Sequence, residues 1–144
     1  IETGNETVDS LLNYKLQRAR EVLQTVEAGV CIPEKLVLHS FDLNVVLGNL
    51  LDNAIEAAAE TEEKKLKLTM ELEKGVLFLH VRNSCQGIAD GRVQRLKTTK
   101  AGASDHGIGL SSVRRIVEKY HGDMEMICEN GDMETDIVMY ISEM

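Results

Sequence analysis

The sequence predicts an α+β protein, built as a two-layer α/β sandwich in which helices cover one face of a mixed, mostly antiparallel sheet. Runs of alternating polar and apolar residues are joined by tight turns at Lys74-Gly75 and Asn130-Gly131, which is typical of antiparallel hairpins. Three other segments repeat apolar residues at the spacing of an α-helix. A chain of 144 residues is long enough to bury one core without disulfides or a structural metal.

These patterns place the elements in a definite order. They are a helix over 7–27, short strands over 30–39 around Pro33, a helix over 42–59, strands over 66–73 and 76–83, a loop over 84–106 with a short helix at 88–97, a helix over 109–120, and strands over 123–129 and 134–142. Gly29 is expected to end the first helix as its C-cap, and Ser40 or Asp42 to cap the second. A loop as long as 84–106 is usually functional.

Composition narrows the function. The net charge is −8, aromatic residues make up 3% and there is no Trp, which disfavours binding to nucleic acid. The cysteines at 31, 85 and 128 form no C-x-x-C pair, so reduced thiols are expected rather than a zinc site. The apolar runs are too short to span a bilayer. The chain begins with Ile1, which suggests a piece of a longer protein.

Two asparagines on the 42–59 helix form the first candidate site. At about 100° per residue, Asn49, Asn53 and Glu56 share one stripe at the edge of the apolar face. Asparagine is a mediocre helix former, so two of them four residues apart need a reason. An amide oxygen at this boundary can coordinate Mg²⁺. A solvated polar stripe explains the helix by itself equally well.

A glycine-rich helix start forms the second candidate. Gly107-Ile108-Gly109-Leu110 opens the 109–120 helix, where free N–H groups and the helix dipole favour a phosphate, although loop glycines are common before helices. Lys100 lies upstream in a basic stretch and is a candidate phosphate contact. Asn83 ends a strand, and it could either pair with a purine edge or form a turn.

The combination of these motifs resembles a known superfamily. The run N-L-L-D-N-A-I-E-A over 49–57 is similar to the N box of the ATPases that unite gyrase, heat-shock chaperones, histidine kinases and mismatch-repair MutL proteins. It looks most like sensor histidine kinases, especially peptide quorum-sensing receptors of the accessory gene regulator type, with citrate and dicarboxylate sensors as relatives. The resemblance covers nearly the whole chain and implies the ATP-binding catalytic domain of such a kinase, with ATP and Mg²⁺ as cofactors.

The resemblance also implies roles for single residues. Asn53 matches the Mg²⁺ ligand, and Asn49 stands where hydrolysing relatives carry a glutamate base. Asn83 stands for the aspartate that pairs with the adenine amino group, and Cys85 replaces the first glycine of that box. The segment 89–106 would be a short lid over ATP, with Lys100 facing the phosphates and, like Asn49, taking a catalytic role. The nucleotide-binding set implied is Asn49, Asn53, Asn83, Gly87, Ile88, Lys100, His106, Gly107, Ile108, Gly109 and Leu110.

A histidine kinase also needs a phosphoacceptor. None of the four histidines, at 39, 80, 106 and 121, stands in an acceptor motif, so a dimerising hairpin is expected upstream. Residues 1–29 would then connect to that hairpin, or form a layer of the catalytic domain at 30–144. The implied setting is the cytoplasmic domain of a membrane-bound bacterial sensor, with a response regulator as partner. Alternatives are a nucleotide-regulated interaction module, such as a pseudokinase or an anti-sigma-like switch, and an ATP-hydrolysing relative.

Overall fold

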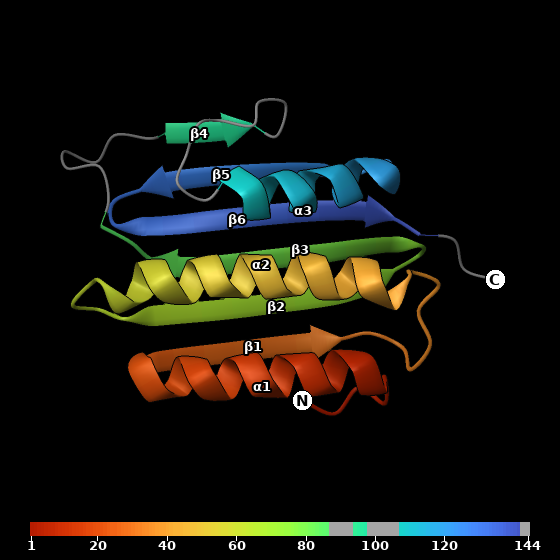
Figure 1. The fold of residues 1–144 in the computed structure, drawn as a ribbon, viewed down its shortest axis with the longest axis horizontal. Coiled ribbons are helices and arrows are strands. Elements are labelled where there is room, and N and C mark those ends of the chain that lie inside the picture. Colours follow the sequence, from red (N-terminus) through yellow and green to blue (C-terminus); the bar gives the residue numbers. More distant parts are fainter. Residues whose placement is uncertain (87–93, 98–106, 142–144) are drawn as a thin grey trace.

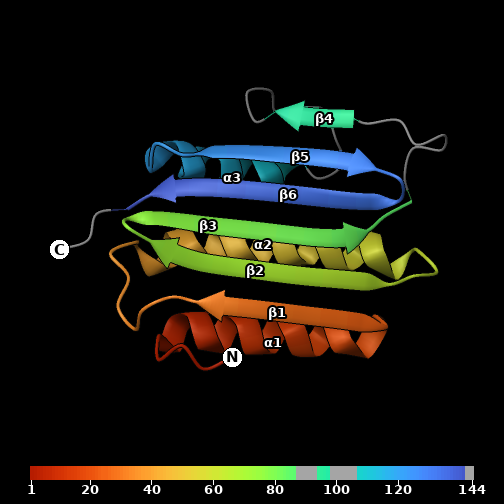
Figure 2. The same cartoon turned by 180° about the vertical axis from the view of Figure 1, so that it is seen from behind.

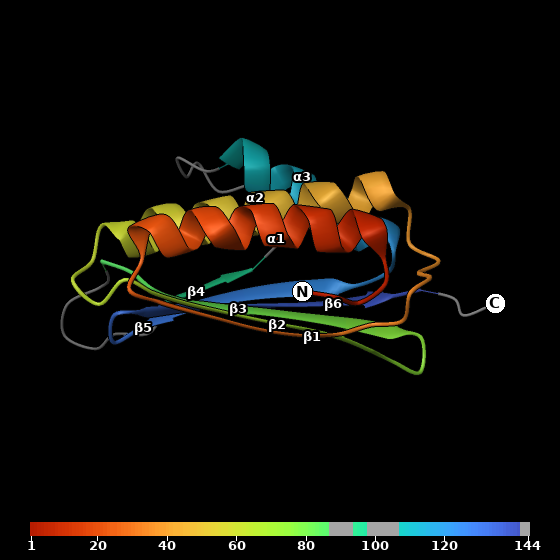
Figure 3. The same cartoon turned by 90° about the horizontal axis from the view of Figure 1, so that it is seen from below.

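The structure is a computed structural model that describes residues 1–86, 94–97 and 107–141. Within these residues, three helices lie on one face of a six-stranded sheet (Figure 1). The edge-on view in Figure 3 shows the two layers plainly, with the helices above the strands. The predicted two-layer α+β sandwich is therefore confirmed.

The strands run in the spatial order β1-β2-β3-β6-β5-β4. β1 is parallel to β2, and every other neighbouring pair is antiparallel, so the sheet is mixed as predicted. Figure 2 shows the uncovered face of this sheet. The elements are α1 Glu6–Val22, β1 Thr25–Cys31, α2 Ser40–Ala59, β2 Lys65–Glu73, β3 Val76–Ser84, β4 Gln94–Lys97, α3 Gly107–Lys119, β5 Asp123–Glu129 and β6 Asp132–Tyr140.

The apolar stripes of the helices meet the sheet in one continuous core. α1 contributes Val8, Leu12, Leu16 and Ala19, all at most 1% exposed. α2 contributes Leu47 and Leu51, which lie over Leu68 and Met70 of β2 and Leu79 of β3 in the same cluster. α1 thus packs into the same core as α2 and lies beside it (Figure 1).

Local chemistry sets the helix starts. The Asn5 side chain caps α1 by accepting a hydrogen bond from the Val8 N–H at 3.1 Å. α2 is capped by His39, whose Nδ1 accepts from the Phe41 N–H at 3.1 Å. The predicted cap at Ser40 or Asp42 was wrong, because Ser40 is already helical and Asp42 is buried against α3.

Three other predictions are corrected. α1 ends at Val22, so Gly29 is no C-cap but lies within β1. The 30–39 segment has no strand beyond Cys31, because the strand begins at Thr25, inside the segment predicted as helix. Residues 94–97 form β4, paired with β5, in place of the expected helix at 88–97, of which 88–93 lie outside the described residues.

A close approach fixes the end of α3 against the sheet. A Cβ on Gly122 would lie 1.9 Å from the Val138 carbonyl oxygen, so only glycine fits there. The chain passes directly from the end of α3 into β5. The N-terminus of α3 lies toward the other end of the sheet (Figure 1). No helix among the described residues is long and apolar enough to cross a membrane.

Candidate functional site

A cavity of about 100 Å³ lies between the middle of α2, the start of α3 and the helix-covered face of β3, β5 and β6. Asn53 and Asn83 both line it, so the fold brings two of the predicted site residues to one place. The remaining wall is mostly apolar. It consists of Leu50, Ala54, Ala57, Val81, Leu110, Met126, Met133 and Thr135.

Asn53 brings an unsatisfied polar group to this wall. Its Nδ2 is buried and has no hydrogen-bond partner among the described residues. Such a group costs free energy unless a partner arrives, typically about 1–3 kcal/mol. Helical spacing puts Asn53 on the edge of the buried face of α2, to one side of the buried Leu50 and Ala54. An amide retained here is best explained by a polar ligand in the cavity.

Asn83 is the second-to-last residue of β3, and it is 3% exposed. Its Nδ2 donates to the Ser84 carbonyl oxygen at 2.9 Å, so part of its hydrogen-bonding capacity is used within the chain. The other part, an acceptor oxygen, remains for a group in the cavity. Thr135 pairs with Val81 across β3 and β6 and supplies a buried hydroxyl to the same wall.

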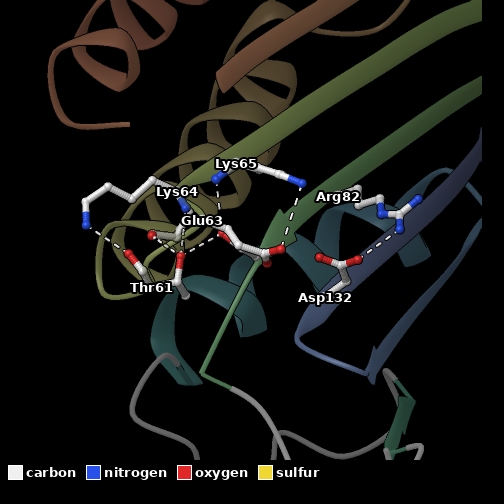
Figure 4. A network of polar contacts seen from close by, with 8 residues as sticks. Thr61, Glu63, Lys64, Lys65, Arg82 and Asp132 are labelled. Carbon is white, nitrogen blue, oxygen red and sulfur yellow. Dashed lines mark hydrogen bonds and ion pairs between the residues drawn. The ribbon is translucent and has the colours of Figure 1, made fainter. Parts of the chain in front are cut away.

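A polar network holds the end of α2 against the end of β3. Thr61, just after α2, shares a 2.8 Å hydrogen bond with the Ser84 hydroxyl, which also accepts from the Lys65 N–H at 3.0 Å. Figure 4 shows Thr61 beside Lys64, whose backbone N–H donates to the Thr61 hydroxyl. Because Ser84 follows Asn83 directly, this network fixes Asn83 relative to the α2 helix that carries Asn53.

Asn49 and Gly109 meet at the start of α3. The Asn49 Nδ2 donates to the Val45 carbonyl at 2.8 Å, which holds the amide in place. A Cβ on Gly109 would lie only 2.9 Å from the Asn49 Oδ1, so the amide and the α3 backbone approach each other closely. Leu110 lines the cavity next to them. The start of α3 therefore lies beside Asn49, and Leu110 of α3 shares the cavity wall with Asn53. The N–H groups in the first turn of a helix are suited to hold a phosphate.

The opposite end of α3 is anchored to α2 by a buried carboxylate. Asp42 accepts hydrogen bonds from the Lys119 ammonium at 2.8 Å and from the Tyr120 hydroxyl at 2.6 Å. These two bonds, that of Lys119 first, hold the pKa of Asp42 below its ordinary value against the opposing effect of burial. The anchor fixes the position of α3 along α2, and hence the position of Gly109 against Asn49.

The remaining predicted residues are only partly placed. Gly107 and Ile108 form the first turn of α3, as expected for the glycine box. Gly87, Ile88, Lys100 and His106 lie outside the described residues, as does most of the expected lid over 89–106. Glu56, the third member of the predicted stripe, is exposed and does not line the cavity.

The sequence reasoning missed seven residues of the cavity wall, and three of them, Met126, Met133 and Thr135, come from β5 and β6. Their place follows from the pairing of β3 with β6 and of β6 with β5, which joins segments far apart in the chain. Met126 and Thr135 lay within the predicted strands 123–129 and 134–142, and Met133 lay just outside them. Nothing in the pattern indicated which part of the sheet is open to a ligand.

A larger hollow, of about 360 Å³, lies on the uncovered face of the sheet. Two of its basic groups are paired with acids, since Arg82 pairs with Asp132 at 2.8 Å and Lys65 with Glu63 at 3.8 Å (Figure 4). Glu27 adds further negative charge. This mixed surface does not concentrate groups of one chemistry, whereas the smaller cavity joins two amides to a helix N-terminus. The smaller cavity is therefore the candidate site.

Comparison with known proteins agrees with this site. The sequence profile of the family described as GHKL domain matches residues 38–140, which include α2, β3 and α3. The chain belongs to the GHKL domain family. The membership accounts for the meeting of an asparagine-bearing helix, the end of β3 and a glycine-rich helix start. The ATPase superfamily predicted from the N box and the glycine box is thereby confirmed.

Individual relatives are sensor kinases. The chain is 29% identical over 136 residues to a probable C4-dicarboxylate sensor kinase of Halalkalibacterium halodurans, covering 87% of this chain and 25% of that protein. It is 30% identical over 91 residues to the sensor histidine kinase DcuS of Escherichia coli K12, covering 62% of this chain and 17% of DcuS. The chain thus spans about a quarter or less of these relatives.

Solved structures share the fold. The nucleotide-free catalytic domain of the histidine kinase ThkA superposes with a TM-score of 0.72 at 22% identity, over 98% of this chain and 96% of ThkA's domain. This near-complete overlap in both directions includes α1 and β1. The unit that the two proteins share therefore extends upstream of the family match at residue 38.

Proposed function

We propose that this GHKL domain is the ATP-binding catalytic domain of a two-component sensor histidine kinase, which positions Mg-ATP for transfer of the γ-phosphoryl group to a histidine on a separate domain. The observation that carries the proposal is the cavity that Asn53 and Asn83 share beside the start of α3. Its apolar wall suits a purine ring, and the amide of Asn83 suits the adenine amino group. The N–H groups at the start of α3 suit the phosphates.

The site also fits a magnesium ion. Mg²⁺ in nucleotide sites is held by one or two protein oxygens together with phosphate oxygens and water. Asn53 would supply that oxygen, and its Nδ2, unpaired in the described residues, would then find an acceptor on the nucleotide. The bound ion would neutralise charge on the phosphates during transfer. The chain's own part is to orient the nucleotide through Asn83 and α3.

Asn49 favours transfer over hydrolysis. An amide cannot take a proton from water as a general base would. In the structure its Nδ2 is bound to Val45 and its Oδ1 faces Gly109, so it serves to support the start of α3. Lys100, which lies outside the described residues, is proposed to face the phosphates from the lid, with Gly87, Ile88 and His106 completing the nucleotide-binding set.

The setting of the domain is part of the same proposal. We infer that residues 1–29, which include α1 and most of β1, connect an upstream phosphoacceptor hairpin to the remainder of the domain at 30–144, and that a response regulator receives the phosphoryl group. Relatives described as sensor kinases support a cytoplasmic domain of a membrane-bound sensor. The N-L-L-D-N-A-I-E-A run supports a place among peptide quorum-sensing receptor kinases as the narrower proposal.

The test is phosphorylation of the protein that joins this domain to its phosphoacceptor hairpin, with ATP labelled at the γ-phosphate. We expect acid-labile label on a histidine and little free phosphate, and we expect the label to be lost in Asn53→Ala. Free phosphate without labelled protein would identify an ATP-hydrolysing relative instead. Neither product, from a folded protein, would favour a nucleotide-regulated interaction module.

A further inference from the structure

Two of the three cysteines meet between the end of β3 and β5. The Sγ atoms of Cys85 and Cys128 are 3.4 Å apart, although the residues are 43 positions apart in the chain. Cys85 immediately follows β3, where its N–H donates to the Gly131 carbonyl of the β5–β6 turn at 2.8 Å. Cys128 lies in β5, paired with Met133. The third cysteine, Cys31, is exposed at the end of β1, the first strand in the sheet order.

Strand periodicity links this pair to the cavity wall. Alternate residues of a strand face the same side, so Cys128 shares a side of β5 with Met126. Cys85 contacts Cys128 and lies two residues after Asn83, just past the end of β3. Asn83 and Met126 both line the cavity of about 100 Å³. A disulfide has an S–S distance of about 2.0 Å, so the bond would draw the two sulfurs together by about 1.4 Å. The movement would shift the end of β3, which carries Asn83, relative to β5, which carries Met126.

We propose that Cys85 and Cys128 are a reversible thiol oxidation site, whose disulfide ties the end of β3 to β5 and weakens nucleotide binding. The oxidant is a low-molecular-weight disulfide such as oxidised glutathione. The thiolate of the half-buried Cys85 attacks one sulfur of that disulfide and releases one small thiol. The deprotonated Cys128 sulfur then attacks the Cys85 sulfur and releases the second small thiol. Two protein thiols and one small disulfide thus become one protein disulfide and two small thiols.

The surroundings of Cys85 make the reaction slow near neutral pH. Burial first, and then the hydrogen bond with Cys128, raises the pKa of the Cys85 thiol to about 12. Because the thiolate is the attacking form, few Cys85 side chains are reactive at pH 7, and the rate rises with pH. The pair thus remains reduced unless the oxidant persists. A structural role alone does not need two thiols in contact, since ordinary apolar side chains would fill the space.

The test uses Cys31→Ser as the background, which removes the exposed third thiol. After incubation with oxidised glutathione at mildly alkaline pH, we expect an intact mass lower by two hydrogens, one peptide that links Cys85 to Cys128, and full recovery with dithiothreitol. Adding Cys128→Ser should instead leave glutathione attached to Cys85. Two results would overturn the site. One is a stable glutathione adduct, with no disulfide, on the Cys31→Ser background. The other is that Cys85 and Cys128 do not react under conditions in which the exposed Cys31 of the wild type is oxidised.

Two further measurements separate the formation of the Cys85–Cys128 disulfide from its effect on nucleotide binding. A disulfide that closes a loop of 43 residues should raise the Tm by roughly 5–10 °C. A Tm that does not rise would contradict a Cys85–Cys128 disulfide that forms without straining the fold. The regulatory part rests on the proposed function, and we expect the ATP dissociation constant to rise about tenfold on oxidation. Equal constants in both forms would overturn regulation while leaving the site intact. If neither form binds ATP, the proposed function fails, and mass and Tm still decide the cysteine site.

Discussion

Replacing Gly109 with alanine tests how the start of α3 supports a phosphate. The added Cβ would lie 2.9 Å from the Asn49 Oδ1 and 3.4 Å from its Cγ, so the amide must move. Moving it strains or breaks the Nδ2 bond to Val45, which is worth about 0.5–1.5 kcal/mol. Gly109 has no positive φ, and alanine in a helix gains roughly 0.5–1 kcal/mol over glycine. The two effects nearly cancel, so we expect a stability change within about 1 kcal/mol.

The effect on binding should be larger and confined to the phosphates. The poorer fit between Asn49 and the α3 N-terminus should cost about 1.4 kcal/mol of binding free energy, which corresponds to a tenfold weaker affinity for Mg-ATP. Adenosine, which lacks phosphates, should bind almost as before. Calorimetric titration with both ligands measures the difference.

The matched control is Gly48→Ala, one residue before Asn49 on α2. A Cβ there meets nothing within 4 Å, so the variant should be as stable as the wild type or more so, and should bind both ligands normally. An equal loss of ATP and adenosine affinity in Gly109→Ala would refute the phosphate cradle. So would an unchanged ATP affinity.

Three other predictions follow from the site and its anchor. Asn53→Ala should abolish the Mg²⁺-dependent part of ATP binding. The Tm should stay within a few degrees of the wild type, because the Nδ2 that the substitution removes has no partner in the described structure. Calorimetry with and without Mg²⁺ and a thermal melt check these two results. Tyr120→Phe should lower the free energy of unfolding by about 1–3 kcal/mol in urea titrations, since it removes the 2.6 Å bond to the buried Asp42, whereas Tyr14→Phe, at a 57% exposed position, should cost almost nothing. The pKa of Asp42 is lowered in the fold, so its stabilisation is complete above the ordinary value of 3.8 and is lost as pH falls through the folded value; Asp42→Asn should flatten this part of the stability profile, and an unchanged acid slope would contradict the anchor.

Much of the fold could be predicted because its elements carry local signals. The β2–β3 and β5–β6 hairpins turn at Lys74-Gly75 and Asn130-Gly131, whose φ angles are all positive as such turns require. The long α2 helix was found within two residues of its start because its apolar stripe is broad. In these elements the pattern and the turn chemistry agree, so tertiary contacts only confirm what the local sequence favours.

The errors lie where long-range contacts decide. Val22, Leu23 and Val26 continue the helical spacing of α1, yet the chain leaves the helix at Leu23 and pairs β1 in parallel with β2. Residues 94–97 likewise become a strand only because β5 offers its edge. Neither partner is near in sequence, so periodicity alone favours the wrong element.

The candidate site shows the same division. Asn49 and Asn53 could be found from one helix, and Gly109 from one helix start, because each is a local motif. That Asn83 shares a cavity with Asn53 was implied by the family pattern and not by spacing. The contributions of Met126 and Thr135 depend on the strand order β3-β6-β5, which the hairpins alone do not determine.

The most direct measurement is calorimetric titration of this chain with ATP, with and without Mg²⁺, with GTP as the control. We expect ATP to bind more tightly with Mg²⁺, and GTP to bind at least tenfold more weakly, because Asn83 offers an acceptor to the adenine amino group and Asn53 an oxygen to the metal. Absent binding by a folded chain, or equal binding of ATP and GTP, would contradict the assignment of the cavity between α2, β3 and α3 as an adenine nucleotide site.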